Sequence, residues 1–114
     1  MKYPDKKFIN EMLQLIKSIM NFCEYDIYIK KNELNIKANL NDIPKLILFL
    51  KDNPSISMET LIDIAAVDFP NEEKRFLVVY NLLSISRNLR IKVKTRISEE
   101  TAIPSITEIF PSAD

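Results

Sequence analysis

Two acidic side chains within an apolar segment are the first candidates for catalytic chemistry. Asp63 and Asp68 lie in and just after the run from Leu61 to Val67. Two carboxylates can work as general acid and general base only when both face one substrate. Successive side chains of a strand point to opposite faces, so a spacing of five residues separates this pair. We therefore predict structural or interface roles for both aspartates, with Asp68 shaping the turn after it.

A second candidate is a series of four basic residues at every other position. Arg90, Lys92, Lys94 and Arg96 alternate with apolar residues and would lie about 7 Å apart on one face of a strand. That spacing resembles the spacing of phosphates along a nucleic acid strand, but no aromatic side chains for base stacking alternate with them. Lysine and arginine also protect sheet edges from aggregation. A solvated or edge-protecting face is therefore favoured, followed by a protein-partner surface and then by nucleic acid.

Other reactive residue types are scarce. Tyr80 sits in an apolar segment and needs a hydrogen-bond partner if it is buried, so a structural or interface role is expected. The chain has no histidine and no glycine, which removes the commonest general base and the glycine-rich phosphate loops. Its single cysteine, Cys23, fits a small core residue. We predict no catalytic residue, no metal site and no cofactor bound by this chain.

Composition indicates an ordinary globular protein. The chain has 114 residues, 46% hydrophobic and 28% charged, which predicts one domain over residues 1–114. Sixteen basic residues balance sixteen acidic ones, so there is no overall charge to favour nucleic acid or anionic lipid. The first residues lack the apolar run of a signal peptide, and no segment approaches the length of a membrane span. Any membrane association is expected to be indirect, through a larger complex.

Hydrophobic periodicity predicts the first four elements. A broad apolar stripe indicates a helix over Asp5 to Met20. Strict alternation over Glu24 to Lys30 and over Glu33 to Leu40 indicates two strands, joined by a turn at Lys31-Asn32. A second helix is expected to end at about Asp52, with Asp42 capping its start and Pro44 in its first turn.

Three further strands follow, at Met58 to Asp68, Arg75 to Ser84 and Leu89 to Ile97. The middle of the first is apolar on both faces, which predicts a central strand covered on both sides or in contact with a partner. Asn88 is a candidate for a left-handed backbone conformation. The predicted fold is a two-layer α+β domain of order α-β-β-α-β-β-β, with a mixed sheet and both helices packed on one face.

The last residues show a helical apolar spacing at Ile106, Ile109 and Phe110 that stops at the end of the chain. We interpret this as the start of a helix in a longer protein, with the C-terminal tail missing. Ile106 and Phe110 are therefore candidate interface residues.

Several short motifs resemble one family in order and spacing. They lie at Leu61-x-Asp63, Val67-Asp68-Phe69-Pro70, Arg75-Phe76, Val79-Tyr80-Asn81-Leu82-Leu83-Ser84, Arg90-Ile91-x-Val93-Lys94-Thr95 and Pro104-Ser105-Ile106-Thr107-x-Ile109-Phe110-Pro111. Together they resemble the 30 kDa subunit, also called the C subunit, of the proton-pumping NADH:quinone oxidoreductase, respiratory complex I. The chain departs from the family at Ala65-Ala66, where a small or glycine-containing segment is usual. The family's aromatic-acidic helix and Arg-Pro tail would lie beyond Asp114.

The resemblance implies a non-catalytic, hydrophilic subunit of the peripheral arm. It implies docking against the quinone-site subunit (the 49 kDa type) and neighbouring iron–sulfur subunits. The complex uses FMN, iron–sulfur clusters, NADH and quinone, none of them bound by this family. The resemblance implies that the subunit lies at the cytoplasmic face of the bacterial inner membrane or at the matrix face of the mitochondrial inner membrane. The alternative is a small nucleic-acid-binding α+β module that uses the basic strand. The predicted interface residues are Asp63, Asp68, Tyr80, Arg90, Lys92, Lys94, Arg96, Ile106 and Phe110.

Overall fold

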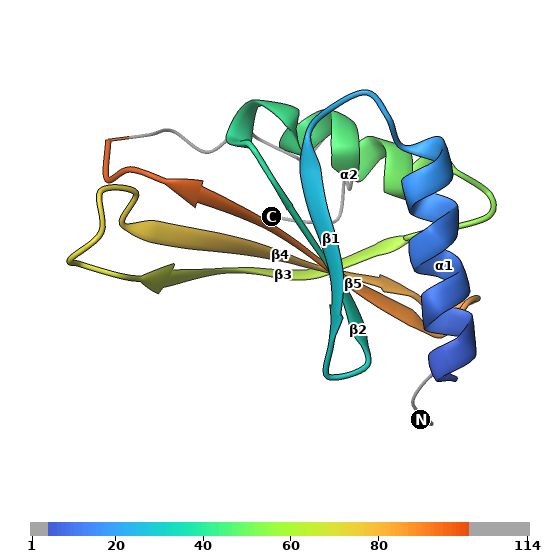
Figure 1. The fold of residues 1–114 in the computed structure, drawn as a ribbon. Helices are drawn as coiled ribbons and strands as arrows, with labels where there is room; N and C mark the ends of the chain where they lie inside the picture. Colours follow the sequence, from blue (N-terminus) through green and yellow to red (C-terminus); the bar gives the residue numbers. More distant parts are fainter. Residues whose placement is uncertain (1–4, 101–114) are drawn as a thin grey trace.

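The computed structural model describes residues 5–100 as two helices packed against a five-stranded sheet (Figure 1). Helices α1 and α2 lie on one face of the sheet, which confirms the predicted two-layer α+β fold and its element order. The predicted helix start at Ile106 and Phe110 lies outside the described residues. The element bounds are α1 Lys6–Ile19, β1 Tyr25–Lys30, β2 Glu33–Ala38, the 3₁₀ turn η1 Leu40–Asp42, α2 Ile43–Asp52, β3 Thr60–Asp68, β4 Phe76–Ser84 and β5 Leu89–Ile97.

Helix α1 begins and ends within one residue of the bounds that its sequence predicts. The Asp5 side chain caps the start by accepting a hydrogen bond of 3.2 Å from the Lys7 backbone N–H. The inward face buries Ile9, Met12 and Ile16 against the sheet. Helix α2 begins differently from our prediction, because η1 precedes it and Asp42 makes no side-chain capping bond. The Ile43 backbone N–H donates to the Leu40 carbonyl, which closes the 3₁₀ turn at the start of the helix.

The turn between β1 and β2 uses two left-handed residues, as the sequence indicates. Lys31 and Asn32 have φ angles of 52° and 60°, the conformation of the tight turns that suit the twist of a hairpin. Asparagine tolerates this left-handed region better than other non-glycine residues do. Lysine lacks the short polar side chain that gives asparagine this tolerance. Asn88, with φ of 50°, confirms the second predicted left-handed position.

Replacing Lys31 with asparagine should stabilise the domain. The side chain is exposed, so the change removes no packing and only eases the backbone strain. We expect the free energy of unfolding to rise by about 0.5–1 kcal/mol, measured by urea denaturation. Lys30→Asn, one residue earlier in the extended strand β1, is the matched control and should be neutral or slightly destabilising. Equal effects of both changes would contradict the left-handed assignment.

The strand order in the sheet is β1-β2-β5-β4-β3. All neighbours are antiparallel except β2 and β5, which are parallel and place β5 at the centre. Two predictions are corrected here. Strand β3 lies at the sheet edge, where residues 62–68 are all exposed, and is not a central strand covered on both sides. Strand β5 is central, so its cations do not protect an edge.

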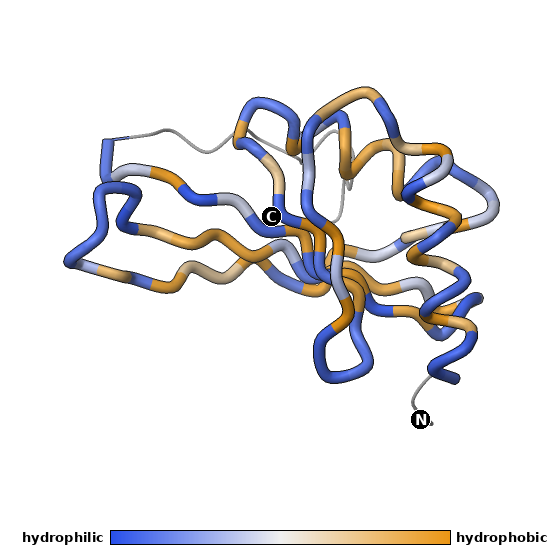
Figure 2. Tube along the Cα trace, in the orientation of Figure 1, coloured by the Kyte–Doolittle hydropathy of each residue, from blue (hydrophilic) through white to orange (hydrophobic). Residues whose placement is uncertain are grey.

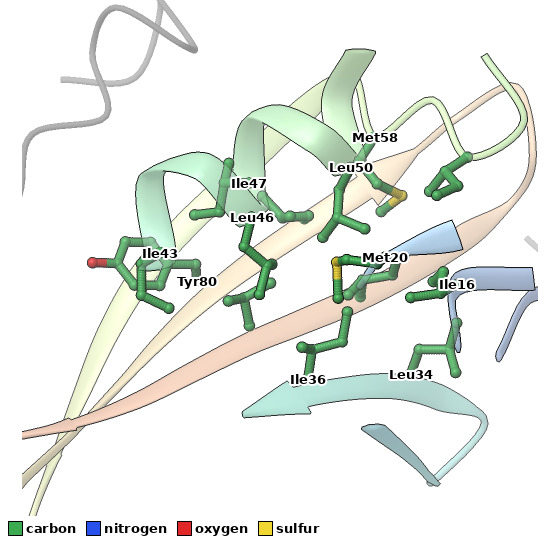
Figure 3. Close-up of a cluster of buried hydrophobic side chains, with 14 of the residues drawn as sticks. Ile16, Met20, Leu34, Ile36, Ile43, Leu46, Ile47, Leu50, Met58 and Tyr80 are labelled. Atoms are coloured by element: carbon green, nitrogen blue, oxygen red, sulfur yellow. The ribbon is translucent and has the colours of Figure 1, made fainter. Parts of the chain in front are cut away.

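The core lies between the helices and the inner face of the sheet. Figure 3 shows side chains from α2, β2, β4 and α1 converging there. Ile16, Leu34, Ile36, Leu46 and Tyr80 are all fully buried in this cluster. The outer ends of β3 and β4 extend beyond both helices (Figure 1), and their apolar stretches continue up to the hydrophilic turn that joins them (Figure 2).

Candidate functional site

The sheet face turned away from the helices is the main candidate surface, and we call it the open face. Strand registry divides it into two halves. Residues from β3 and β4 make an apolar half, and the cations of β5 make a basic half beside it. The apolar half consists of Ala65, Val67, Leu77, Val79 and Leu83, and the basic half of Arg90, Lys92, Lys94 and Arg96. The predicted placement of four cations on one face is therefore confirmed.

A polar row crosses the open face between the apolar residues. Asp63, Asn81, Lys92 and Asn35 lie opposite one another on four adjacent strands. The Asn81 side-chain amide donates a hydrogen bond of 2.5 Å to the Asp63 carboxylate. At the other end, the Lys92 ammonium lies 3.7 Å from the Glu33 carboxylate. The row fixes the orientation of Asp63 and Lys92 on a surface that is otherwise apolar or basic.

Three of the four cations have partners within the domain. Lys92 pairs with Glu33. The Lys94 ammonium donates a hydrogen bond of 3.2 Å to the Tyr28 hydroxyl and lies 5.6 Å from the centre of that ring. Arg96 pairs with Glu72 and stacks 4.3 Å above the centre of the Phe69 ring. These contacts hold the basic side chains in place and compensate part of their charge.

The fourth cation, Arg90, is exposed at the end of the series, opposite Leu83. The basic half therefore combines three positioned cations with one exposed guanidinium. Such an ordered surface suits recognition of one defined partner, because less side-chain freedom is lost on binding.

Asp68 lies on the other face of β3 from Asp63, as the odd spacing predicts. Its carboxylate accepts two hydrogen bonds from Arg75, at 2.7 and 2.8 Å, across the base of the β3–β4 turn. Arg75 also lies 3.5 Å from Glu99. Because the two aspartates diverge and each already has a hydrogen-bond partner, they form no acid–base pair.

The Asp68–Arg75 pair predicts a specific pH response. The hydrogen bond and charge of Arg75 lower the pKa of the Asp68 carboxyl below its usual range. The pair therefore stabilises the turn fully above the ordinary aspartate pKa, and this contribution is lost as the pH falls through the lowered pKa of Asp68. An NMR titration should show an Asp68 midpoint below that of an ordinary aspartate. In Arg75→Gln the midpoint should return upward, and an unchanged midpoint would rule out the pairing.

Tyr80 is placed in the core and not on the open face. Its side chain is fully buried on the inner face of β4, and burial raises the pKa of its phenol. Figure 3 shows the ring beside Ile43, with its hydroxyl at the margin of the cluster. Among residues 5–100 the hydroxyl has no hydrogen-bond partner. A fully buried side chain cannot touch a partner protein directly, so Tyr80 acts through packing.

Removing the Tyr80 hydroxyl should not destabilise the domain. An unpaired buried hydroxyl costs about 1–3 kcal/mol of desolvation, and phenylalanine keeps the ring. We expect Tyr80→Phe to leave the free energy of unfolding unchanged or to raise it by up to about that amount, measured by chemical denaturation. Tyr25→Phe is the control, because the Tyr25 hydroxyl donates a 2.7 Å bond to the Met20 carbonyl and should cost about 1 kcal/mol. A larger loss for Tyr80→Phe would reveal a partner for its hydroxyl.

Residues able to hold a metal do not gather anywhere in the part of the chain that the structure describes. Within those same residues, no helix is long and apolar enough to cross a membrane.

Burial raises the pKa of the Cys23 thiol, which disfavours the reactive thiolate. A polar groove lies where β2 and β5 end, lined by residues including Tyr25, Lys37, Asp42 and Arg96.

The apolar half of the open face was not predicted as part of the site from the sequence. The pattern of the Met58 to Asp68 segment predicted that Ile62, Ile64 and Val67 are covered on both sides of a central strand or contact a partner, and Leu77 and Val79 were not among the predicted interface residues. The sequence did contain a signal for this surface, because a strand that is apolar on both faces needs other protein groups to cover each face. Only the sheet order shows which face the domain leaves uncovered.

The fold and the open face together define a class of protein, a two-layer α+β domain with one sheet face left uncovered by its own helices. The chain belongs to the family described as the respiratory-chain NADH dehydrogenase 30 Kd subunit, whose model matches residues 36–114. This confirms the resemblance to the C subunit of complex I.

Individual relatives agree with the family match. The chain is 42% identical over 100 residues to the C subunit of NADH-quinone oxidoreductase from Parvibaculum lavamentivorans, covering 88% of this chain and 48% of that protein. It is 46% identical over 84 residues to the C subunit from Rhodospirillum rubrum, covering 74% and 39%. It is 37% identical over 113 residues to the NADH-ubiquinone oxidoreductase subunit 9 of Reclinomonas americana, covering 98% and 55%. The chain thus spans about half the length of the curated relatives it matches.

Proposed function

We propose that this chain is a non-catalytic structural subunit in the peripheral arm of NADH:quinone oxidoreductase. It supports electron transfer from NADH to quinone, coupled to proton translocation, by holding neighbouring subunits in place. The observation that carries this proposal is the open face, where an apolar half lies beside positioned cations. The family match supports membership of the complex, and the open face supports this mode of action.

The composition of the open face suits a protein partner. Exposed contiguous apolar area rimmed by polar residues is typical of interaction surfaces. Leu77 and Leu83 are half-buried and Val67 is exposed, so a partner would remove further apolar surface from water. The cations beside them would select a partner that is apolar where it meets β3 and β4 and acidic where it meets β5.

The proposed partners are the quinone-site subunit of the 49 kDa type and the neighbouring iron–sulfur subunits. Membrane association would then be indirect, at the cytoplasmic face of a bacterial inner membrane or the matrix face of a mitochondrial one. FMN, the iron–sulfur clusters, NADH and quinone would be bound by other subunits. In this chain the residues that could hold such groups are few, since it has no histidine, no glycine and a single cysteine.

Co-purification tests the proposal. A tagged copy of the complete protein, expressed in its own cells, should recover the quinone-site subunit and the iron–sulfur subunits at equal stoichiometry. NADH:quinone oxidoreductase activity should accompany them. A tagged protein that is recovered alone, as a soluble monomer, would overturn the proposed function.

The nucleic-acid alternative gains no support from the relatives or from the structure. Three of the four cations on β5 already contact an acidic or aromatic group of the domain. Tyr28 and Phe69 each have one of these cations above the ring, which leaves less ring surface for base stacking.

A further inference from the structure

Strand β3, at the sheet edge, is the most exposed strand of the sheet. Seven successive residues, 62–68, are exposed, although all of them except the two aspartates are isoleucine, alanine or valine. The exposed fractions of Ile62, Ile64 and Val67 are 44%, 47% and 44%. An edge strand also leaves the backbone N–H and C=O groups of every second residue unpaired. Strand β3 thus offers both apolar side chains and hydrogen-bonding groups.

The opposite edge of the same sheet shows how this chain protects a strand. Strand β1 has six residues and carries Asp26 and Lys30 on one face, with Lys31 in the following turn. Helix α1 packs beside it (Figure 1). Short length, charge and cover are the usual means of preventing edge-to-edge pairing. Strand β3 has nine residues, no lysine, arginine or proline, and its outer half extends beyond the helices.

The segment around β3 is acidic along its whole length. Residues 59–73 contain five carboxylates and no basic residue: Glu59, Asp63, Asp68, Glu72 and Glu73. Asp68 and Glu72 are paired with Arg75 and Arg96. Glu59 and Asp63 accept hydrogen bonds from Ser86 and Asn81, which are neutral, so those contacts leave the negative charge uncompensated. This charge lies on and just before the exposed edge.

We propose that β3 is a strand-docking site, at which an extended segment of a neighbouring protein adds a sixth strand to the sheet. The docking segment would carry apolar residues beside Ile64 and Val67 and a lysine or arginine beside Asp63. Backbone hydrogen bonds to the free edge would supply affinity, and the side chains would supply specificity. This inference deepens the proposed function, on which it rests for the identity of the complex, and it uses the sheet edge where that proposal uses the open face.

A second copy of this chain is the less suitable occupant. Antiparallel pairing of two β3 strands about Ile64 would place Glu59 of each copy beside the start of the other copy's turn, which carries Glu72 and Glu73. Like charges brought together in this way oppose association. A basic partner strand meets the same carboxylates with opposite charge. For either occupant, the irregular register between Leu61 and Asp63 limits regular pairing to the part of the strand from Asp63 onward.

Site-specific photocrosslinking in the assembled complex tests this inference. A photoreactive phenylalanine analogue is placed at Ile64 of the tagged complete protein, and crosslinked peptides are identified by mass spectrometry. The control position is Leu48 on α2, which is also apolar and 42% exposed but lies in the helix layer. We expect one strong crosslink from Ile64 to an extended segment of another subunit that contains lysine or arginine. From Leu48 we expect none to that segment.

A charge series at Asp63 gives the second readout. With the crosslinker at Ile64, Asp63→Lys should reduce the yield at least tenfold, and Asp63→Asn should reduce it by a smaller factor. Folding is checked by circular dichroism of each variant. Crosslinks only within the chain itself, only to a second copy, or to nothing would overturn the strand-docking site.

The two proposals fail in different ways. Recovery of the other subunits without the Ile64 crosslink would overturn strand docking and leave the proposed function intact. A crosslink to a basic strand of a protein outside the complex, without recovery of the other subunits, would support strand docking and overturn the proposed function.

Discussion

Replacing Ile36 with alanine is expected to lower the free energy of unfolding by about 2–5 kcal/mol. Ile36 is fully buried in the middle of β2, where it lies opposite Ile27 of β1 and Val93 of β5. Losing three methyl or methylene carbons there removes apolar contacts and leaves a cavity that the surrounding strands cannot fill. Small domains are stable by only about 5–15 kcal/mol, so this single change would remove a large share of the total.

The control is the same deletion at an exposed isoleucine. Ile85 is 68% exposed in the turn between β4 and β5, and Ile85→Ala should change stability by less than about 0.5 kcal/mol. Ile36→Val should fall between them, at about 0.5–1.5 kcal/mol. Guanidinium denaturation followed by circular dichroism measures all three. A cost for Ile36→Ala no greater than that for Ile85→Ala would contradict the position of β2 in the core.

Local patterns in the sequence predicted the elements well because those patterns have local causes. The alternation from Leu89 to Ile97 gave the bounds of β5 and the side of each residue, since the pleat of a strand fixes which side chains face the core. The turns at Lys31-Asn32 and Asn88 were recognised because few residue types tolerate positive φ. Helix α1 was predicted to within one residue at each end.

The order of strands could not be predicted in the same way. Strand β5 pairs in parallel with β2, and fifty residues lie between the two strands along the chain. No short-range pattern records such a pairing. An apolar pattern on both faces of β3 fits a central strand and a partner-covered edge equally well, because both conditions call for apolar side chains. Of these two positions, the observed strand order agrees only with the edge.

The basic half of the candidate site was predicted from the sequence, and the apolar half was not. The four cations of β5 share one face because their spacing of two requires it. The adjacent residues Leu77 and Val79 entered the site only once the registry placed them opposite Arg96 and Lys94. Tyr80, on the same strand, was predicted to have a structural or interface role, and its alternation with Val79 and Asn81 turns its side chain toward the core.

Reversing charge on the open face is expected to reduce assembly by at least tenfold. Arg90→Glu with Lys94→Glu changes two cations that flank the polar row on the basic half, and like charges set against a complementary surface cost several kcal/mol. Neither residue belongs to the core, and the Lys94–Tyr28 contact is exposed, so little stability is lost with it. The measurement is the amount of quinone-site subunit recovered with the tagged complete protein, at equal expression.

The matched control applies the same change in charge on the other side of the domain. Lys7→Glu with Lys17→Glu alters two exposed lysines of α1, which belongs to the helix layer. If long-range attraction between whole molecules governed assembly, both pairs would weaken recovery equally, because both change the net charge by the same amount. If contact at the open face governs it, only the β5 pair lowers recovery. Equal loss from both pairs would therefore show that the open face is not part of the interface, whatever the complex to which the chain belongs.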